Sequence, residues 1–91
     1  MGKDRLFQIL PFVKYQLYDG EYILLNIKSG DYYQLDNETS IYIWSLLQTQ
    51  RSIREIIGLV LKRFGGDKKA VIDGVTRFIR HLEKERLVNS R

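Results

Sequence analysis

The chain has 91 residues, enough for one hydrophobic core and too few for two, so we expect a single domain. It contains no cysteine, which excludes disulfides, thiolate metal sites and thiol nucleophiles, and this composition fits a reducing compartment. The net charge of +4 is unevenly placed, because residues 51–91 carry eleven Lys and Arg against five Asp and Glu. No apolar run approaches the roughly 20 residues of a membrane-spanning helix, so we expect a soluble, cytoplasmic protein without a membrane partner.

Three short segments rich in Tyr, Ile and Leu follow one another in the first half of the chain. Residues 14–18 and 21–27 are separated by Asp19-Gly20, a pair that favours a type I′ hairpin turn. Turn residues at 28–31 lead into residues 32–35, which are short and aromatic enough to form a third strand. The pattern predicts a three-stranded antiparallel meander, and its last strand is expected to have an open edge.

After residue 35 the spacing of apolar residues changes and indicates helices. Ile41, Trp44 and Leu47 repeat every three residues behind a cap at Asp36 or Asn37, which predicts a first helix with Trp44 in the core.

A second and a third helix follow, each with its own start signal. Ser52 and Glu55 stand in the relation of a capping box, ahead of apolar residues at helical spacing. Gly65-Gly66 supplies a stop for the second helix, and Asp67 can cap a third helix that runs to about Arg86.

The third helix carries an apolar stripe that we expect to point inward. The stripe consists of Val71, Val75, Phe78 and Leu82, with Ile72 and Ile79 on one flank. Gly74 lies on the other flank, where the missing side chain leaves room. The opposite side of the helix carries Arg77, Arg80 and Lys84.

The first residues are harder to assign, because Pro11 interrupts the apolar segment 6–13. We expect this segment to be at most an edge strand or an irregular arm. The chain then divides into an N-terminal arm, residues 1–11, and an α+β domain, residues 12–88, in which a three-stranded meander precedes three helices.

This order of elements resembles the PqqD-like family, the recognition elements for precursor peptides that are made on the ribosome and then modified. The resemblance covers roughly residues 12–88. It is carried by Tyr33-Gln34-Leu35-Asp36, Ile43-Trp44 with Leu47, Ser52-Ile53 with Glu55-Ile56, the stripe of Val71, Val75, Phe78 and Leu82, and Leu87-Val88. It implies a winged helix-turn-helix-like fold that does no chemistry, needs no cofactor or metal, and binds the leader of a precursor peptide as an added strand between strand three and helix three.

A free-standing member of this length is similar to the small recognition proteins of lasso peptide clusters, which work with a separate leader protease and a macrocyclase. The stand-alone PqqD type, which serves a radical SAM enzyme, is equally close in architecture. Family members often carry an acidic residue directly before the valine that matches Val75, whereas here that position is Gly74 and the carboxylate is Asp73. No polar contact is therefore carried over to this position. The oligomeric state stays open.

From the resemblance we expect the peptide to lie along strand three and helix three. The candidate binding residues are Tyr32, Tyr33, Gln34 and Leu35 on the strand, and Val71, Gly74, Val75, Arg77 and Phe78 on the helix. Alternation along a strand sends one of the two tyrosines to each face, and the sequence leaves open which one meets the peptide. Arg77 is either a partner for acidic leader residues or part of a solvated helix face.

Two other functions were weighed against peptide binding. A pI near 9.5 and the basic second half favour nucleic-acid binding, but the strands precede the helices, whereas a DNA-binding wing usually follows them. For an enzyme, the chain has one histidine, His81, which we expect at the surface, and no cysteine, so neither a Cys-His pair nor a zinc site can form. Gly65-Gly66 also lacks the pattern of a phosphate-binding loop.

Overall fold

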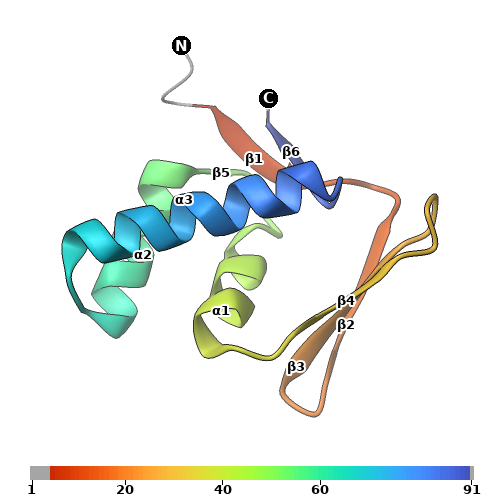
Figure 1. Cartoon of the computed structure of the whole chain (residues 1–91), viewed down its shortest axis with the longest axis horizontal. Coiled ribbons are helices and arrows are strands. Elements are labelled where there is room, and N and C mark those ends of the chain that lie inside the picture. Colours follow the sequence, from red (N-terminus) through yellow and green to blue (C-terminus); the bar gives the residue numbers. More distant parts are fainter. Residues whose placement is uncertain (1–4, 91) are drawn as a thin grey trace.

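The computed structural model describes residues 5–90, and these residues form six strands and three helices (Figure 1). In chain order the elements are β1 Leu6–Ile9, β2 Val13–Tyr18, β3 Glu21–Asn26, β4 Tyr32–Leu35, α1 Glu38–Leu46, β5 Arg51–Ser52, α2 Ile53–Phe64, α3 Lys68–Lys84 and β6 Val88–Ser90. The predicted α+β fold, with an antiparallel meander of β2, β3 and β4 followed by three helices, is confirmed. Among the described helices, none is long and apolar enough to cross a membrane.

The meander turns where the sequence predicts. Asp19 and Gly20 both have positive φ angles, 52° and 81°, as a type I′ turn requires. Burial alternates along β3, so that Tyr22 and Leu24 face the core while Ile23 and Leu25 lie on the outer face. One face of the sheet therefore packs on the helices, and the other stays uncovered.

The predicted helix caps are also present. Asn37, rather than Asp36, caps α1, because its side chain accepts the backbone N–H groups of residues 39 and 40. Ser52 and Glu55 form the capping box of α2, in which each side chain accepts the other residue's backbone N–H. The carboxylate of Asp67 accepts the backbone N–H of residue 70 at 3.0 Å and so starts α3.

The third helix ends two residues earlier than predicted, at Lys84. Arg86 adopts a left-handed conformation with φ of 61°, which a helix cannot continue. The backbone N–H of Leu87 then returns to the carbonyl oxygen of Leu82 at 2.9 Å, the bond that closes a Schellman-type helix end.

The prediction for the N-terminal segment is wrong. Instead of an edge strand or an irregular arm, β1 is the central strand of a second sheet and pairs antiparallel with both β5 and β6. Pro11 lies after the strand and takes no place in its ladder. Phe7 of this strand is 2 % exposed and belongs to the core. Residues 1–4 of the predicted arm lie outside the described residues.

The core lies where the inner face of the meander meets the three helices. Trp44 is fully buried in it, as predicted, and His81 is exposed, as predicted. The inward face of α3 differs from the predicted stripe, since Val75, Ile79 and Leu82 are buried whereas Ile72 is 36 % exposed. Val71 and Phe78 of the stripe are only half-buried, and they remain available at the margin of the core. The buried face of α3 is therefore centred on Val75, Ile79 and Leu82 instead of on the predicted stripe.

Candidate functional site

The outer edge of β4 carries backbone groups that no strand within residues 5–90 satisfies. The backbone N–H of Asn26 donates to the carbonyl oxygen of Asp31 at 3.0 Å, so the backbone of Asn26 points across the hairpin toward Asp31. Bonded and non-bonded pairs alternate along an antiparallel ladder. With Leu24 opposite Tyr33 and Leu25 opposite Tyr32, the backbone of Tyr33 points toward β3 and that of Tyr32 points away.

By the same alternation, Leu35 points its backbone toward β3 and Gln34 points its backbone away from it. Tyr32 and Gln34 together therefore present two N–H donors and two carbonyl acceptors along the open edge. This is the arrangement to which an extended peptide can add as a further strand.

The side chains of β4 separate onto two faces. Leu35 and Tyr33 lie on the inner face, opposite Tyr22 and Leu24, and Leu35 is buried in the core. Tyr32 lies on the outer face and is 74 % exposed. Gln34 is also exposed, and its side-chain amide donates to the carboxylate of Glu21. Of the two tyrosines, Tyr33 is thus the one that points toward the helices.

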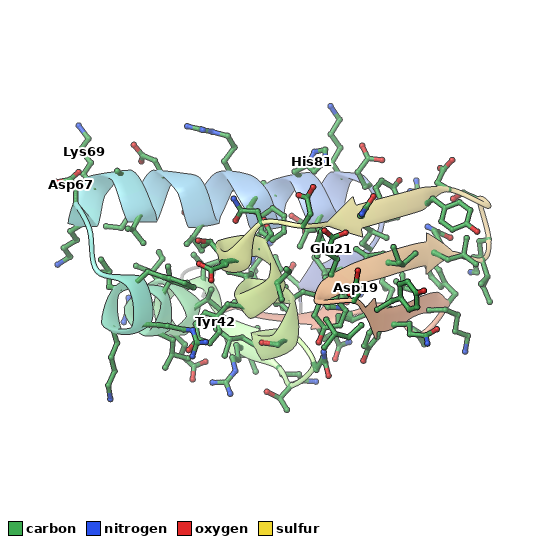
Figure 2. All side chains as sticks on the ribbon, turned by 90° about the horizontal axis from the view of Figure 1, so that it is seen from below. Asp19, Glu21, Tyr42, Asp67, Lys69 and His81 are labelled. Atoms are coloured by element: carbon green, nitrogen blue, oxygen red, sulfur yellow. The ribbon has the colours of Figure 1, made fainter. Side chains whose placement is uncertain are left out.

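Two contacts hold the β3–β4 hairpin against the end of α3, the helix that runs past β4 in Figure 2. The Tyr33 hydroxyl donates to Oε1 of Glu85 at 2.7 Å, just beyond the helix. This hydrogen bond, together with burial and the nearby negative charges of Glu85 and Asp31, raises the pKa of Tyr33 to about 12. The second contact is the Asn26 side chain, whose Nδ2 donates to the Arg86 carbonyl oxygen at 3.4 Å.

The Asn26 side chain also shapes the turn before β4. Its Oδ1 accepts the backbone N–H groups of Lys28 and Ser29, at 2.9 and 3.2 Å. Because Asn26 is itself buried, these bonds satisfy a polar group that is costly to leave unpaired. The β3–β4 hairpin is therefore fixed in place beside α3.

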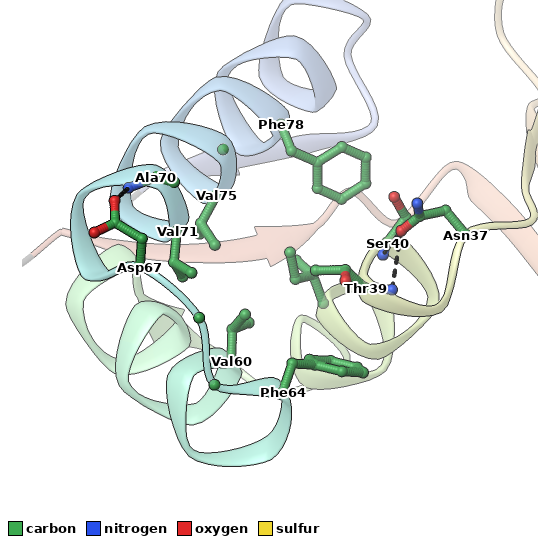
Figure 3. A pocket seen from close by; sticks show the side chains of 14 residues that line it. Asn37, Thr39, Ser40, Val60, Phe64, Asp67, Ala70, Val71, Val75 and Phe78 are labelled. Atoms are coloured by element: carbon green, nitrogen blue, oxygen red, sulfur yellow. Dashed lines mark hydrogen bonds between the residues drawn. The ribbon is translucent and has the colours of Figure 1, made fainter.

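Beyond the end of β4, an apolar pocket of about 470 Å³ opens between α1, α2 and α3 (Figure 3). The start of α1, the end of α2 and one flank of α3 line it. Its residues are Asn37, Thr39, Ser40, Ile43, Val60, Phe64, Gly65, Gly66, Asp67, Ala70, Val71, Gly74, Val75 and Phe78. Among the described residues, one charged side chain lines it, Asp67, whose carboxylate accepts a backbone N–H at the start of α3.

The structure brings together four of the five helix residues predicted for the site, because Val71, Gly74, Val75 and Phe78 all line this pocket. Arg77 does not line it and is exposed on the helix surface. Sequence reasoning missed Phe64 and the residues at the start of α1. Phe64 is visible in the sequence as the last apolar residue of its helix, but its place opposite Phe78 depends on how the helices pack.

Gly74 faces this pocket without being required by the packing. A Cβ atom at this position would meet no atom within 4 Å, so the space in front of it is open. Gly in a helix interior is destabilising relative to Ala by about 1 kcal/mol. Within residues 5–90, no group of three His, Asp or Glu side chains could hold a metal ion.

Comparisons with known proteins identify the family of this chain. The family model described as coenzyme PQQ synthesis protein D (PqqD) matches residues 21–88. A solved structure described as TbiB1 in complex with the TbiA(beta) leader peptide is similar to this chain, with 29% sequence identity and a TM-score of 0.81, over 90% of this chain and 94% of that one. None of the curated proteins matches. The resemblance predicted from the order of the elements is confirmed, and the chain belongs to the PqqD family.

Proposed function

We propose that this protein binds the leader of a ribosomally synthesised precursor peptide as an added strand on the open edge of β4 and presents it to a processing enzyme, without doing chemistry itself. The observation that carries the proposal is the free edge of β4 beside an apolar pocket. The similarity to TbiB1, whose structure was solved with a leader peptide, supports it.

Energetics explain why both the edge and the pocket are needed. Four backbone hydrogen bonds contribute about 0.5–1.5 kcal/mol each, and ordering a disordered leader costs about 2–5 kcal/mol. These terms nearly cancel, whereas micromolar binding requires about 8 kcal/mol. At about 25 cal/mol per Å², the remainder corresponds to roughly 300 Å² of buried apolar surface, or about two large side chains. The pocket beside α3 offers a place to bury them.

The meander has a second free edge, on β2, but its surroundings suit a peptide less well. The hollow beside it is lined by three glutamines, Gln8, Gln48 and Gln50, and exposes mainly polar surface. Burial of apolar anchors against such a surface is weak. We therefore place the peptide on β4, with Tyr32, Tyr33, Gln34 and Leu35 on one side of it and Val71, Gly74, Val75 and Phe78 on the other. Arg77, at the surface of α3, would meet acidic leader residues that extend past the pocket.

The pathway that fits best is lasso peptide biosynthesis, with the leader protease and the macrocyclase as the enzymes that receive the bound precursor. TbiB1, whose structure was solved with a leader peptide, is similar to this chain over 90% of this chain and 94% of that one. A radical SAM enzyme is the alternative partner, because PqqD itself serves one. The precursor and enzymes encoded beside this chain distinguish the two pathways.

Gln34→Pro tests the edge directly, because the backbone N–H of Gln34 points away from β3 and proline removes it without breaking the hairpin ladder. We expect leader binding, measured by isothermal titration calorimetry with the leader encoded beside the chain, to weaken at least about tenfold. Leu17→Pro is the matched control. Leu17 is exposed and its N–H points to the free edge of β2, so its replacement should leave the affinity unchanged.

Circular dichroism of both variants checks that the helices still form. If Gln34→Pro binds the leader as tightly as the unchanged protein does, the peptide does not add to β4. If both proline variants bind equally weakly, the loss reflects disturbance of the sheet and the proposal fails.

A further inference from the structure

A second groove lies on a different flank of α3, between that helix, α2 and β1. Its volume is about 460 Å³, close to that of the pocket beside β4, which lies between α1, α2 and α3. Four apolar side chains line it: Phe7, Ile53, Ile57 and Ile72. Four cationic side chains and one threonine complete the lining: Arg5, Arg54, Lys68, Arg80 and Thr76. Among the described residues, 5–90, no carboxylate lines it.

The α3 side of this groove has a regular order. Lys68, Ile72, Thr76 and Arg80 follow one another at intervals of four residues, so they form one row along the helix. The row spans roughly 18 Å from Lys68 to Arg80, with an exposed isoleucine between two cations. Lys68 and Arg80 are exposed, and neither is held by a salt bridge to another side chain within residues 5–90. The charges are therefore available to a partner.

The two flanks of α3 differ in their electrostatics. Counting the described residues only, the pocket beside β4 is lined by no Lys or Arg and by one carboxylate, whereas the second groove is lined by four cations and no carboxylate. The residues that line the two hollows do not overlap. A ligand in one leaves the other open, so both can be occupied at once.

We propose that this second groove, the basic groove, docks the leader protease through a segment of that enzyme in which carboxylates flank an apolar side chain. The apolar side chain would pack on Ile72 and Ile57, and the carboxylates would meet Lys68 and Arg80. Charge complementarity supports this occupant, because a groove whose charged lining residues are all Lys or Arg attracts an acidic partner and repels a basic one. The inference rests on the proposed function, since it assumes that the bound leader is passed to an enzyme.

The test compares two double variants that change the net charge equally. Lys68→Glu/Arg80→Glu reverses both ends of the row, whereas Lys69→Glu/Lys84→Glu reverses two exposed lysines of the same helix that line neither hollow. Biolayer interferometry measures binding of the leader protease encoded beside this chain, and calorimetry measures binding of the leader to the same variants. We expect the groove variant to bind the protease at least about tenfold more weakly and the control variant to stay within about threefold of the unchanged protein. Leader affinity should stay unchanged in both.

The outcomes separate the two proposals. If the unchanged protein binds the leader but the groove variant retains its affinity for the protease, the docking proposal is overturned and leader binding stands. The docking proposal is also overturned if the unchanged protein does not bind the protease. The same holds if the groove variant binds a duplex oligonucleotide more weakly but binds the protease as tightly as the unchanged protein does. Failure of the unchanged protein to bind the leader contradicts the proposed function instead.

Discussion

Gly58 and Gly74 have similar surroundings and differ in whether they line the pocket beside β4. Both are exposed helical residues, and at neither would a Cβ atom meet another atom within 4 Å. Gly74 lines the pocket beside β4, whereas Gly58 lies on α2 outside it. Since the packing of the protein requires neither glycine, the pair allows a test of whether a peptide backbone approaches α3.

Gly74→Leu and Gly58→Leu should each stabilise the protein by about 0.8 kcal/mol, because leucine is the better helix former. Thermal unfolding followed by circular dichroism measures this gain. Only Gly74→Leu should weaken leader binding, by about fivefold or more, because its side chain fills space next to the bound backbone. Equal leader affinities for the two variants would show that the peptide does not pass Gly74.

Tyr33 and Glu85 form a single hydrogen bond between β4 and the end of α3. The folded protein raises the pKa of Tyr33 from its ordinary 10.0 to about 12, mainly through this bond. The folded state therefore favours the protonated phenol. This stabilisation is complete below pH 10 and is lost as the pH rises from 10 to 12.

Tyr33→Phe should lower the free energy of unfolding by about 1 kcal/mol at pH 7 and at pH 9. The difference from the unchanged protein should shrink above pH 10, where Tyr33 begins to ionise on unfolding. Urea denaturation at several pH values measures it. Tyr32→Phe is the control, since Tyr32 is 74 % exposed and should show no effect at any of them. A Tyr33→Phe difference that is independent of pH up to 12 contradicts this assignment.

At the level of whole elements, features coded by neighbouring residues could be predicted from the sequence. The type I′ turn and the capping box depend on residues two or three positions apart. The role of β1 could not be predicted, because its partners β5 and β6 lie more than 40 and about 80 positions away. A four-residue segment before a proline gives no local signal of such partners.

The residues of the candidate site also divide into those that the sequence could predict and those that it could not. Val71, Gly74, Val75 and Phe78 share one flank of α3, so a helical wheel groups them without a structure. Phe64 and Asn37 join them only because α1 and α2 pack where they do. Arg77 was grouped with them from the resemblance, and the structure places it outside the pocket.

The end of α3 contains strain that a substitution can relieve. Arg86 has a φ of 61°, a conformation that costs a residue with a side chain about 1–2 kcal/mol. Arg86→Gly should stabilise the protein by about 0.5–1 kcal/mol, because part of the gain is offset by the greater freedom of glycine in the unfolded chain. Lys84→Gly, within the helix, should destabilise it by about 1 kcal/mol. Urea denaturation measures both, and destabilisation by Arg86→Gly would refute the argument.

For the molecule as a whole, the positions of the charged side chains matter more for the choice of partner than the net charge does. The net charge of +4 and a pI near 9.5 favour a nucleic-acid partner in the sequence alone. In the part of the chain that the structure describes, no cation lines the pocket beside β4, and the cations of the basic groove lie on another flank of α3. Leader binding should therefore depend mainly on backbone bonds and apolar burial.

A salt titration tests this separation. Leader affinity should change less than about threefold between about 50 and 300 mM salt, because few charges meet in the pocket. Binding dominated by phosphate contacts would weaken by about a thousandfold or more over a similar range. A steep loss of leader affinity with salt would mean that Arg77 and its neighbours, rather than the pocket, dominate the complex.

The pairing of β1 with β6 also affects how the protein reaches its native state during translation. Phe7 of β1 lies opposite Ser90 in the native ladder, so this pairing has to wait until residues 88–90 have been synthesised. Closing so long a loop carries a large entropic penalty and is slow compared with formation of the β2–β3 hairpin. Until residues 88–90 are available, the nascent chain lacks β6 as a partner for β1, and a chaperone that binds aromatic segments should contact the stretch around Phe7 first.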